Sequence, residues 1–232
     1  LPWHYKIGTP SAANCWTDED MRRRMTAIYM GMISMMDHHL GLILDHLEAT
    51  GQADNTIVVF TADHGDYLGH HGFRSKGLPA YDDVQRIPFI VRMPGAMQKA
   101  AGSASGAIVS QIDLAPTFLN WAGVEIPDAM QGLDVPEALS GETQDGREEA
   151  IVELRPVRDG IYQKTLVTPD YKLVVYDHIE WGELYDRKAD PEQLENLFDK
   201  PDYRDKREEL TRRLIRCEMG YEARRPRRTS YA

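Results

Sequence analysis

The chain has 232 residues, of which 42% are hydrophobic and 28% are charged. That length suits one large domain or a domain with a small appendage, and the composition is that of an ordinary globular chain. The formal net charge of −10 at pH 7 argues against broad nucleic-acid binding, and no apolar run approaches the roughly 20 residues that a membrane helix needs. We therefore expect neither a nucleic acid nor a membrane as a partner.

The first regular element expected along the chain is a long helix after Thr17. Thr17 is a suitable N-cap, residues 18–20 are acidic, and Gly51 suits the position that follows a helix C-terminus. Between these signals, apolar side chains recur every three or four residues, and many of them are methionines. This stripe predicts a buried helix face, because methionine fills irregular gaps in a core.

An apolar run after the helix ends at a potential metal-binding corner. Residues 56–61 are rich in β-branched side chains and predict a buried strand in a parallel sheet. Asp63-His64-Gly65 follows directly, at the strand end where open α/β sheets place their ligand sites. Adjacent side chains of a strand point to opposite faces, so binding one metal requires a turn there, which Gly65 permits. Alternatively, Asp63 caps a turn and His64 packs at a helix entry.

The sequence after this corner predicts a long functional loop. Residues 63–86 contain several glycines and lead into a predicted strand at residues 88–93. Loops of that length without regular structure are uncommon in compact domains and are usually functional. Lys76 and Arg86, together with a bound metal ion, would make this loop locally positive within an acidic chain. An anionic ester is the substrate that suits such a site.

A second helix is expected over residues 110–123. Ser110 or Asp113 provides a suitable cap, and apolar residues follow at helical spacing. The stretch at residues 141–146 is polar and glycine-containing, which is typical of a boundary between domains.

We therefore expect two domains, residues 1–143 and residues 144–232. The arginine-rich residues 224–228 are interpreted as a solvated tail. The sequence of the second domain predicts three short antiparallel strands, at residues 150–154, 160–167 and 171–177. It also predicts one helix at residues 202–218, with Leu210, Leu214 and Cys217 facing inward.

Two segments carry a family resemblance. Residues 55–72, Asn-Thr-Ile-Val-Val-Phe-Thr-Ala-Asp-His-Gly-Asp-Tyr-Leu-Gly-His-His-Gly, look like the sulfatases and phosphonate monoester hydrolases of the alkaline phosphatase superfamily. Residues 111–119 resemble the segment that sulfatases carry after their metal corner. The resemblance covers most of residues 17–200 and implies an α/β fold: part of an alkaline phosphatase-like sandwich with a mainly parallel sheet, plus a small C-terminal α+β subdomain.

The resemblance also implies roles for three residues of the loop. Asp63 and His64 occupy the positions of two metal ligands. Lys76, in Ser75-Lys76-Gly77, matches the lysine that binds the sulfate or phosphate group and stabilises charge in the transition state. We therefore expect Lys76 to act in both catalysis and substrate binding.

Two further positions have alternative interpretations. Arg86 fits the family pattern as a substrate-binding residue, or it is structural and pairs with Asp82 or Asp83. His71 stands where relatives carry a histidine, and it either donates a proton to the leaving group or forms part of the pocket wall. His70 departs from the pattern, because relatives have an acidic residue there.

The resemblance implies two cofactors. One is a divalent metal, with calcium as the first candidate and manganese, magnesium or zinc as alternatives. The other is a formylglycine nucleophile, which sulfatases make from a C-x-P-S-R type motif. Cys15 does not stand in such a motif and is assigned no catalytic role. We expect the nucleophile and two further carboxylates to lie in an N-terminal segment that is missing here.

The predicted function is metal-assisted hydrolysis of a sulfate ester by a sulfatase-like enzyme. A phosphonate or phosphate mono- or diester hydrolase is the alternative within the enzyme class. A bound metal and a positively charged side chain suit each of these tetrahedral anions, so the residues do not distinguish between them. A non-catalytic metal-binding fragment is the alternative outside it. The expected partner is an anionic ester, and an oligomer is compatible with the sequence.

Overall fold

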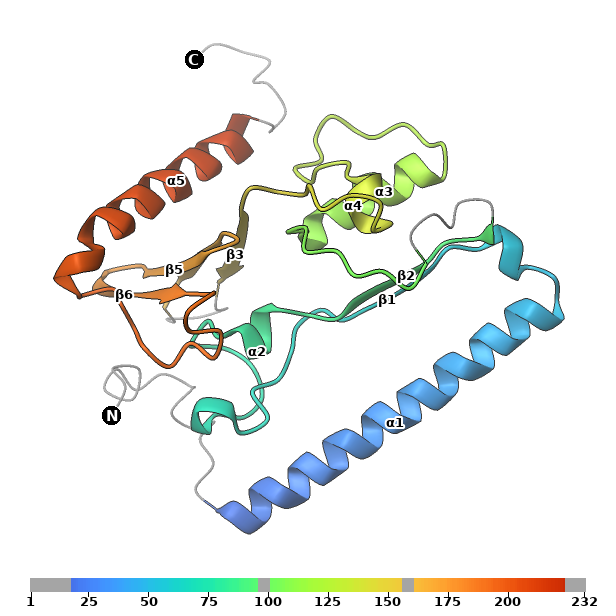
Figure 1. Cartoon of the computed structure of the whole chain (residues 1–232), viewed down its shortest axis with the longest axis horizontal. Helices are drawn as coiled ribbons and strands as arrows, with labels where there is room; N and C mark the ends of the chain where they lie inside the picture. Colours follow the sequence, from blue (N-terminus) through green and yellow to red (C-terminus); the bar gives the residue numbers. More distant parts are fainter. Residues whose placement is uncertain (1–17, 96–100, 156–160, 224–232) are drawn as a thin grey trace. The chain divides into compact units, whose positions relative to one another are not determined.

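The structure is a computed structural model that describes residues 18–95, 101–155 and 161–223 (Figure 1). Cys15 and the arginine-rich residues 224–228 lie outside this part of the chain. Two compact units are present, Leu1–Ala101 and Gly102–Ala232. The predicted division at residues 143/144 stays a prediction.

The first unit begins with the long helix α1 (Glu19–Ala49). Asp18, one residue beyond the predicted cap, caps it by accepting the backbone N–H groups of Asp20 and Met21 at 2.9 and 3.2 Å. Gly51 follows the helix with φ +68°, the left-handed conformation predicted for the residue after the C-terminus.

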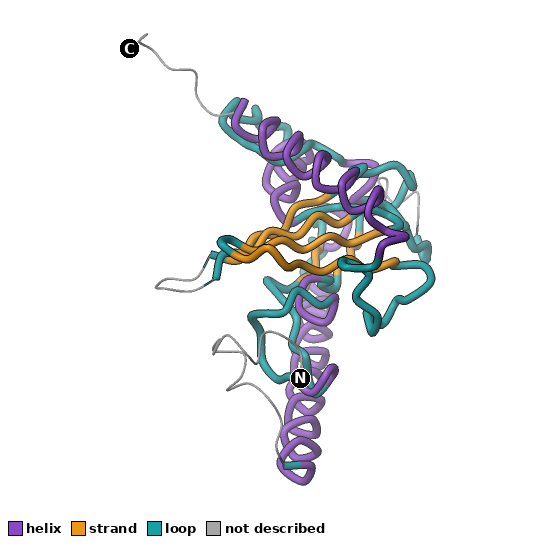
Figure 2. Tube along the Cα trace, turned by 90° about the vertical axis from the view of Figure 1, so that its left-hand side faces the viewer, coloured by secondary structure: helices purple, strands orange, loops and turns teal. Residues whose placement is uncertain are grey.

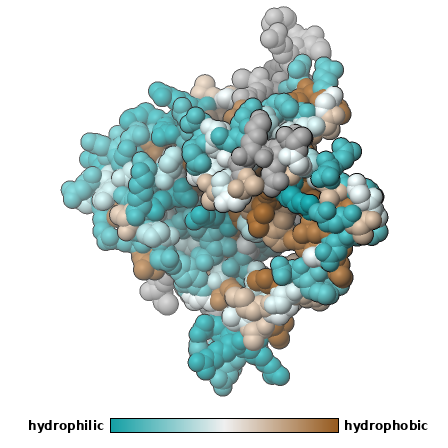
Figure 3. Space-filling model, turned by 45° about the vertical axis from the view of Figure 1, so that its right-hand side comes forward, coloured by the Kyte–Doolittle hydropathy of each residue, from teal (hydrophilic) through white to brown (hydrophobic). Residues whose placement is uncertain are grey.

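The predicted burial of the methionine stripe is wrong for this structure. Helix α1 has no buried residue, and Met21, Ile28 and Met36 are 48–50% exposed. Apolar periodicity shows that a helix face can be buried, but burial needs a second element, and none of the described residues covers this face. On the face of the molecule drawn in Figure 3, apolar residues reach the surface among polar ones. No helix among the described residues has both the length and the apolar character needed to cross a bilayer.

Strands β1 (Val58–Thr61) and β2 (Phe89–Arg92) form an antiparallel pair, so the parallel partner expected for β1 is not found in the described residues. Both strands are mostly half-buried. Antiparallel pairing places Thr61 opposite Phe89, and the Thr61 hydroxyl donates to the Pro88 carbonyl oxygen at 2.9 Å. The intervening residues 62–88 therefore leave and re-enter the strand pair at the same end, which closes them into a pinned loop.

This loop has a small core of its own. Tyr67, Phe73 and Ala80 are at most 2% exposed. The Tyr67 hydroxyl donates to the backbone carbonyl of Gly77 at 2.7 Å, and the Tyr67 N–H donates to the Ser75 carbonyl at 3.0 Å. Two short helices lie in the loop, η4 (His70–Gly72) and α2 (Asp82–Gln85). The predicted irregular loop is thus a folded substructure that can hold its polar side chains in place.

The second unit begins with three short helices: η6 (Gln111–Asp113), α3 (Leu114–Trp121) and α4 (Pro136–Leu139). Ser110 and Asp113, the two alternative caps expected from the sequence, together form a capping box. Asp113 is fully buried and also forms a bidentate ion pair with Arg147, which the sequence did not indicate.

A four-stranded antiparallel sheet follows in the order β3-β4-β5-β6. Helix α5 (Arg204–Ala223) lies along this sheet (Figure 2). Leu210 and Leu214 of α5 are buried against sheet leucines, as predicted, and the half-buried Cys217 packs against the same cluster. The strands of the sheet are β3 (Ala150–Leu154), β4 (Gln163–Val167), β5 (Tyr171–Tyr176) and β6 (Ile179–Asp186).

The other face of this sheet buries a carboxyl group. Glu183 is 1% exposed and accepts hydrogen bonds from the hydroxyls of Tyr185, at 2.8 Å, and Tyr176. Burial raises the pKa of Glu183, and it outweighs the two tyrosine hydroxyls and Lys172, which lower it. Folding therefore makes this carboxyl harder to ionise than it is in the unfolded chain.

Replacing Glu183 with glutamine should stabilise the chain increasingly as the pH rises. A raised pKa in the folded state contributes stability that is complete below the unfolded value of about 4.3 and is lost as the pH rises through the folded value. Glutamine stays neutral, so the melting temperature of the variant should exceed that of the wild type increasingly from acid to neutral pH. Thermal unfolding across that range, with the exposed Glu180→Gln as control, tests this, and a difference independent of pH would contradict it.

Candidate functional site

The candidate site lies at the start of the pinned loop, where the chain turns at Gly65. The Gly65 N–H donates to the Val84 carbonyl oxygen at 2.9 Å, so the backbone of α2 lies directly against residue 65. A Cβ atom on residue 65 would overlap the carbonyl oxygen of Asp83. Only glycine fits this close approach, which explains its place after Asp63 and His64.

Asp63 and His64 present an oxygen and a nitrogen donor beside each other. The Asp63 Oδ1 atom accepts the backbone N–H of His64 at 2.9 Å, and Asp63 Oδ2 lies 3.5 Å from His64 Nε2. The Asp63 side chain is 85% exposed and that of His64 is 36% exposed. The two side chains thus lie together on the same side of the chain, as joint binding of one metal ion would require.

Lys76 completes this group from the far side of the loop. Its Nζ atom lies 2.6 Å from Nε2 of His64. His64 Nδ1 lies 2.8 Å from the Gly65 carbonyl oxygen, which can only accept, so Nδ1 carries the ring proton. Nε2 is then the unprotonated nitrogen and accepts from the lysine. The structure brings Asp63, His64 and Lys76 together, although their roles stay predictions.

The donor set fits two ligands of a divalent metal. A ligating histidine usually donates its other ring N–H to a carbonyl or carboxylate, and the bond from His64 Nδ1 to Gly65 meets that requirement. The carboxylate of Asp63 and the unprotonated Nε2 of His64 suit several divalent cations. The described residues therefore provide a fitting part of a metal site without selecting the metal.

His71 packs against other rings of the loop. Its ring stacks on Tyr81 with centroids 3.6 Å apart and planes 2° apart, and His70 lies beside it at 4.1 Å. His70 Nδ1 bonds to the carboxylate of Asp83 at 2.7 and 2.8 Å. The sequence showed His70 as a departure from the family pattern but gave no signal for its partner. The proton-donor role of His71 stays a prediction.

Arg86 lies at the C-terminal end of α2 with an exposed side chain. In the described part of the chain it forms no ion pair, while Asp83, one of its two suggested partners, is bonded to His70. Substrate binding by Arg86 stays a prediction.

The described residues contain one cysteine, Cys217, and it does not fit a nucleophile. It does not stand in a C-x-P-S-R motif, and its thiol donates to Glu149 Oε1 at 2.9 Å. Burial, followed by the bond to Glu149, raises the pKa of Cys217 to about 12. Such a thiol stays protonated near neutral pH and is inert.

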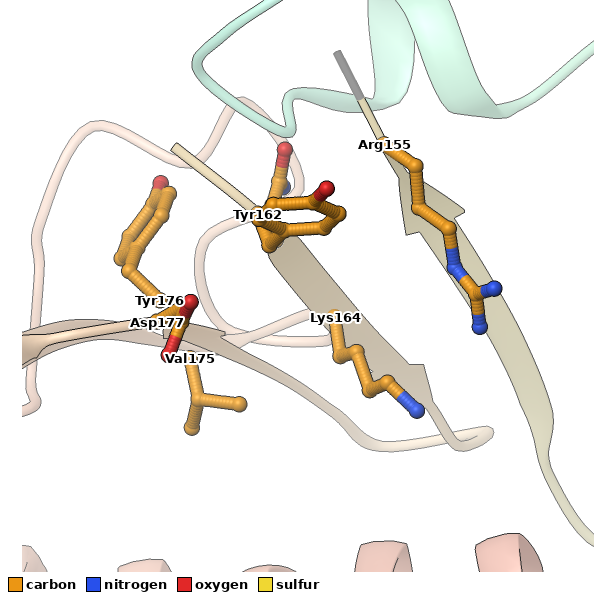
Figure 4. A pocket seen from close by; sticks show the side chains of 7 residues that line it. Arg155, Tyr162, Lys164, Val175, Tyr176 and Asp177 are labelled. Carbon is orange, nitrogen blue, oxygen red and sulfur yellow. The ribbon is translucent and has the colours of Figure 1, made fainter. Parts of the chain in front are cut away.

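A separate open hollow of about 440 Å³ lies on the sheet of the second unit (Figure 4). Its lining includes Tyr162, Tyr176 and two cations, Arg155 and Lys164. Both cations are paired with Glu153, at 2.8 and 2.9 Å, and their charge is thereby largely neutralised. We assign this hollow no anion-binding role.

Comparison with known proteins identifies the family. Residues 3–124 match the family model described as Sulfatase, and residues 69–219 match the one described as N-sulphoglucosamine sulphohydrolase, C-terminal. An N-acetylglucosamine-6-O-sulfatase of Bacteroides thetaiotaomicron is 38% identical over 200 residues, which are 83% of this chain and 35% of that protein. The chain thus spans about a third of the length of this relative.

Solved structures of related proteins also match this chain. One, a complex with its substrate D-glucosamine-2-N,6-O-disulfate, matches with a TM-score of 0.74 at 36% identity, over 82% of this chain and 40% of that one. The phosphonate monoester hydrolase SpPMH of Silicibacter pomeroyi matches with a TM-score of 0.79 at 29% identity, over 88% and 42% of the two chains. These structures confirm the predicted fold class, and the family implies a divalent metal and a formylglycine. The chain belongs to the sulfatase family of the alkaline phosphatase superfamily.

Proposed function

We propose that the protein hydrolyses sulfate esters with the help of a divalent metal, and that this chain supplies one side of the active site. The observation that carries the proposal is the group of Asp63, His64 and Lys76. A carboxylate, an unprotonated imidazole nitrogen and an ammonium group lie within 3.5 Å of their neighbours on a pinned loop. An anionic ester needs this combination of metal ligands and fixed positive charge.

The residues have distinct parts in this proposal. Asp63 and His64 hold the metal, which acts as a Lewis acid on the ester when bound. Lys76 binds the anionic group and stabilises the charge that develops in the transition state. Arg86 contributes to anion binding, and His71 donates a proton to the leaving group.

Two ligands are too few for a hard cation. Calcium, the first candidate metal, takes six to eight oxygen ligands, whereas Asp63 and His64 together offer one carboxylate and one imidazole. We therefore propose that the remaining ligands and the formylglycine nucleophile come from parts of the protein outside the described residues. This division of the site also explains how a short chain can carry family motifs without a complete site.

The relatives suggest which ester to test first. The Bacteroides thetaiotaomicron relative is named for the 6-O-sulfate of N-acetylglucosamine, and one solved neighbour holds a doubly sulfated glucosamine. A sulfated amino sugar is therefore the proposed natural type of substrate. Phosphonate ester hydrolysis is the second candidate, because the phosphonate monoester hydrolase matches with a TM-score of 0.79.

Replacing Asp63 with asparagine should lower kcat/KM for 4-nitrophenyl sulfate by at least about 100-fold, because loss of even an outer-shell partner of a metal ligand costs about 10- to 100-fold. Asparagine keeps an oxygen but loses the negative charge, so excess calcium should restore part of the activity. The assay uses protein from the complete reading frame, with the matched phosphate and phosphonate esters and glucosamine 6-sulfate as competing substrates. Asp128→Asn, an exposed change elsewhere, is the control. Full activity in the Asp63 variant, or no hydrolysis of any ester by metal-loaded wild type, would refute the proposal.

A further inference from the structure

We propose a second metal site, formed by His70, His71 and Asp83, that takes a zinc-like divalent ion. Each of the three side chains offers one ligand atom, and these atoms all lie within 4.8 Å of one another. All three residues are half-buried. The proposed sulfate-ester chemistry assigns its metal to Asp63 and His64, so this site goes beyond that function.

The backbone of η4 brings the two histidines together. His71 has φ 52° and ψ 15°, a left-handed conformation that only a few per cent of non-glycine residues adopt. Gly69, just before, has φ +99°, and its N–H donates to the Phe73 carbonyl at 2.8 Å to close the turn. As a result, the imidazoles of two consecutive residues lie with centroids 4.1 Å apart. In a regular strand they would point to opposite faces.

Neighbouring groups orient both rings. Tyr81 stacks flat against His71 with 3.6 Å between the ring centroids. The carboxylate of Asp83 holds His70 Nδ1 at 2.7 and 2.8 Å, with side-chain exposures of 24% for Asp83 and 34% for His70. Asp83 itself is fixed by the backbone, because the Val84 carbonyl that follows it accepts the Gly65 N–H. The three donors are therefore assembled by packing and hydrogen bonds before any ion binds.

The donor types select the class of ion. Two imidazoles and one carboxylate suit zinc, nickel, copper or ferrous iron, while calcium and magnesium prefer a shell of oxygens. Three protein ligands would leave one position of a tetrahedral zinc ion for water or another ligand. The two sites of this loop thus differ in their donors, with one carboxylate and one imidazole at Asp63-His64 and two imidazoles and one carboxylate here.

A bound ion would link the two halves of the loop. His70 and His71 lie in η4, before Lys76, and Asp83 lies in α2, after it. Zinc would thereby stiffen the segment that positions Lys76, and it would withdraw His71 from proton donation. We expect zinc to raise the thermal stability of the chain and to inhibit ester hydrolysis.

Zinc titration of this chain tests the site. After removal of bound metals, calorimetry with zinc chloride in excess calcium should give one tight site, and cobalt should give the visible absorption of a four-coordinate ion. His70→Asn and Asp83→Asn should each weaken zinc binding by more than the 10- to 100-fold that loss of an outer-shell partner costs. Two variants at different ligands keep the test valid if one fails to fold, and circular dichroism checks each fold.

Two control variants separate the site from other histidines. The double change His38→Ala and His39→Ala removes another adjacent pair, with ring centroids 5.6 Å apart on α1, and should leave the tight site intact. Asp63→Asn should also leave it intact, which separates this proposal from the sulfatase proposal. Unchanged zinc affinity in the His70 and Asp83 variants, or loss of the tight site in the His38/His39 control, would overturn the assignment.

Discussion

Replacing Lys76 with alanine should lower kcat/KM for a sulfate ester by about 10²- to 10³-fold, the range for loss of one group that stabilises developing charge. The Lys76 Nζ atom lies 2.6 Å from Nε2 of the proposed metal ligand His64. Its positive charge is therefore held directly beside a proposed metal ligand, where it would attract an anionic group. Steady-state kinetics with protein from the complete reading frame measures the effect.

The conservative variant separates charge from geometry. Arginine keeps the positive charge but presents a planar fork in place of a compact ammonium, so Lys76→Arg should recover only part of the activity. Lys188, an exposed lysine paired with Asp170 at 2.6 Å in the second unit, provides the matched control, and Lys188→Ala should stay at wild-type activity. If Lys76→Ala behaves like this control, Lys76 has no part in catalysis.

Replacing Asp113 with alanine should lower the free energy of unfolding by about 3–5 kcal/mol, the usual loss when one partner of a buried ion pair is removed. The side chains of Asp113 and Arg147 are 0% and 7% exposed. Asp113 also accepts the backbone N–H groups of Ser110 and Leu133 at 3.0 and 2.8 Å. The variant leaves the guanidinium and these two donors without their acceptor. Urea unfolding of this chain measures the loss.

The controls test whether the buried charge is the cause. Asp128→Ala, an exposed change in the same unit, should stay within about 0.5 kcal/mol of the wild type. Adding Arg147→Met to Asp113→Ala should recover part of the lost stability, because the uncompensated charge is then removed. Equal unfolding energies for Asp113→Ala and Asp128→Ala would mean that this ion pair does not stabilise the unit.

Local signals in the sequence correctly predicted much of the architecture. Gly51 ends α1 because a left-handed residue terminates a helix, and Ser110 and Asp113, each expected as a possible cap, lie just before α3. Strand β3 was predicted with its observed bounds. The motif around Asp63, which is local in sequence, led to the family that the comparisons establish. Each of these features depends on residues within a few positions of one another.

Tertiary structure decided what depends on distant partners. It set the partner and direction of β1 and the exposure of the α1 stripe. It also brought His64 to Lys76 and His70 to Asp83, and no local sequence pattern encodes the proximity of these residues. From side-chain type alone, Asp83 was a possible partner of Arg86. In the folded chain, Asp83 lies beside His70 instead. The sequence by itself thus determined the elements and the family chemistry, because these follow from local propensity and contiguous motifs. Only the fold decided which charged and ligating groups meet, because long-range packing sets those distances.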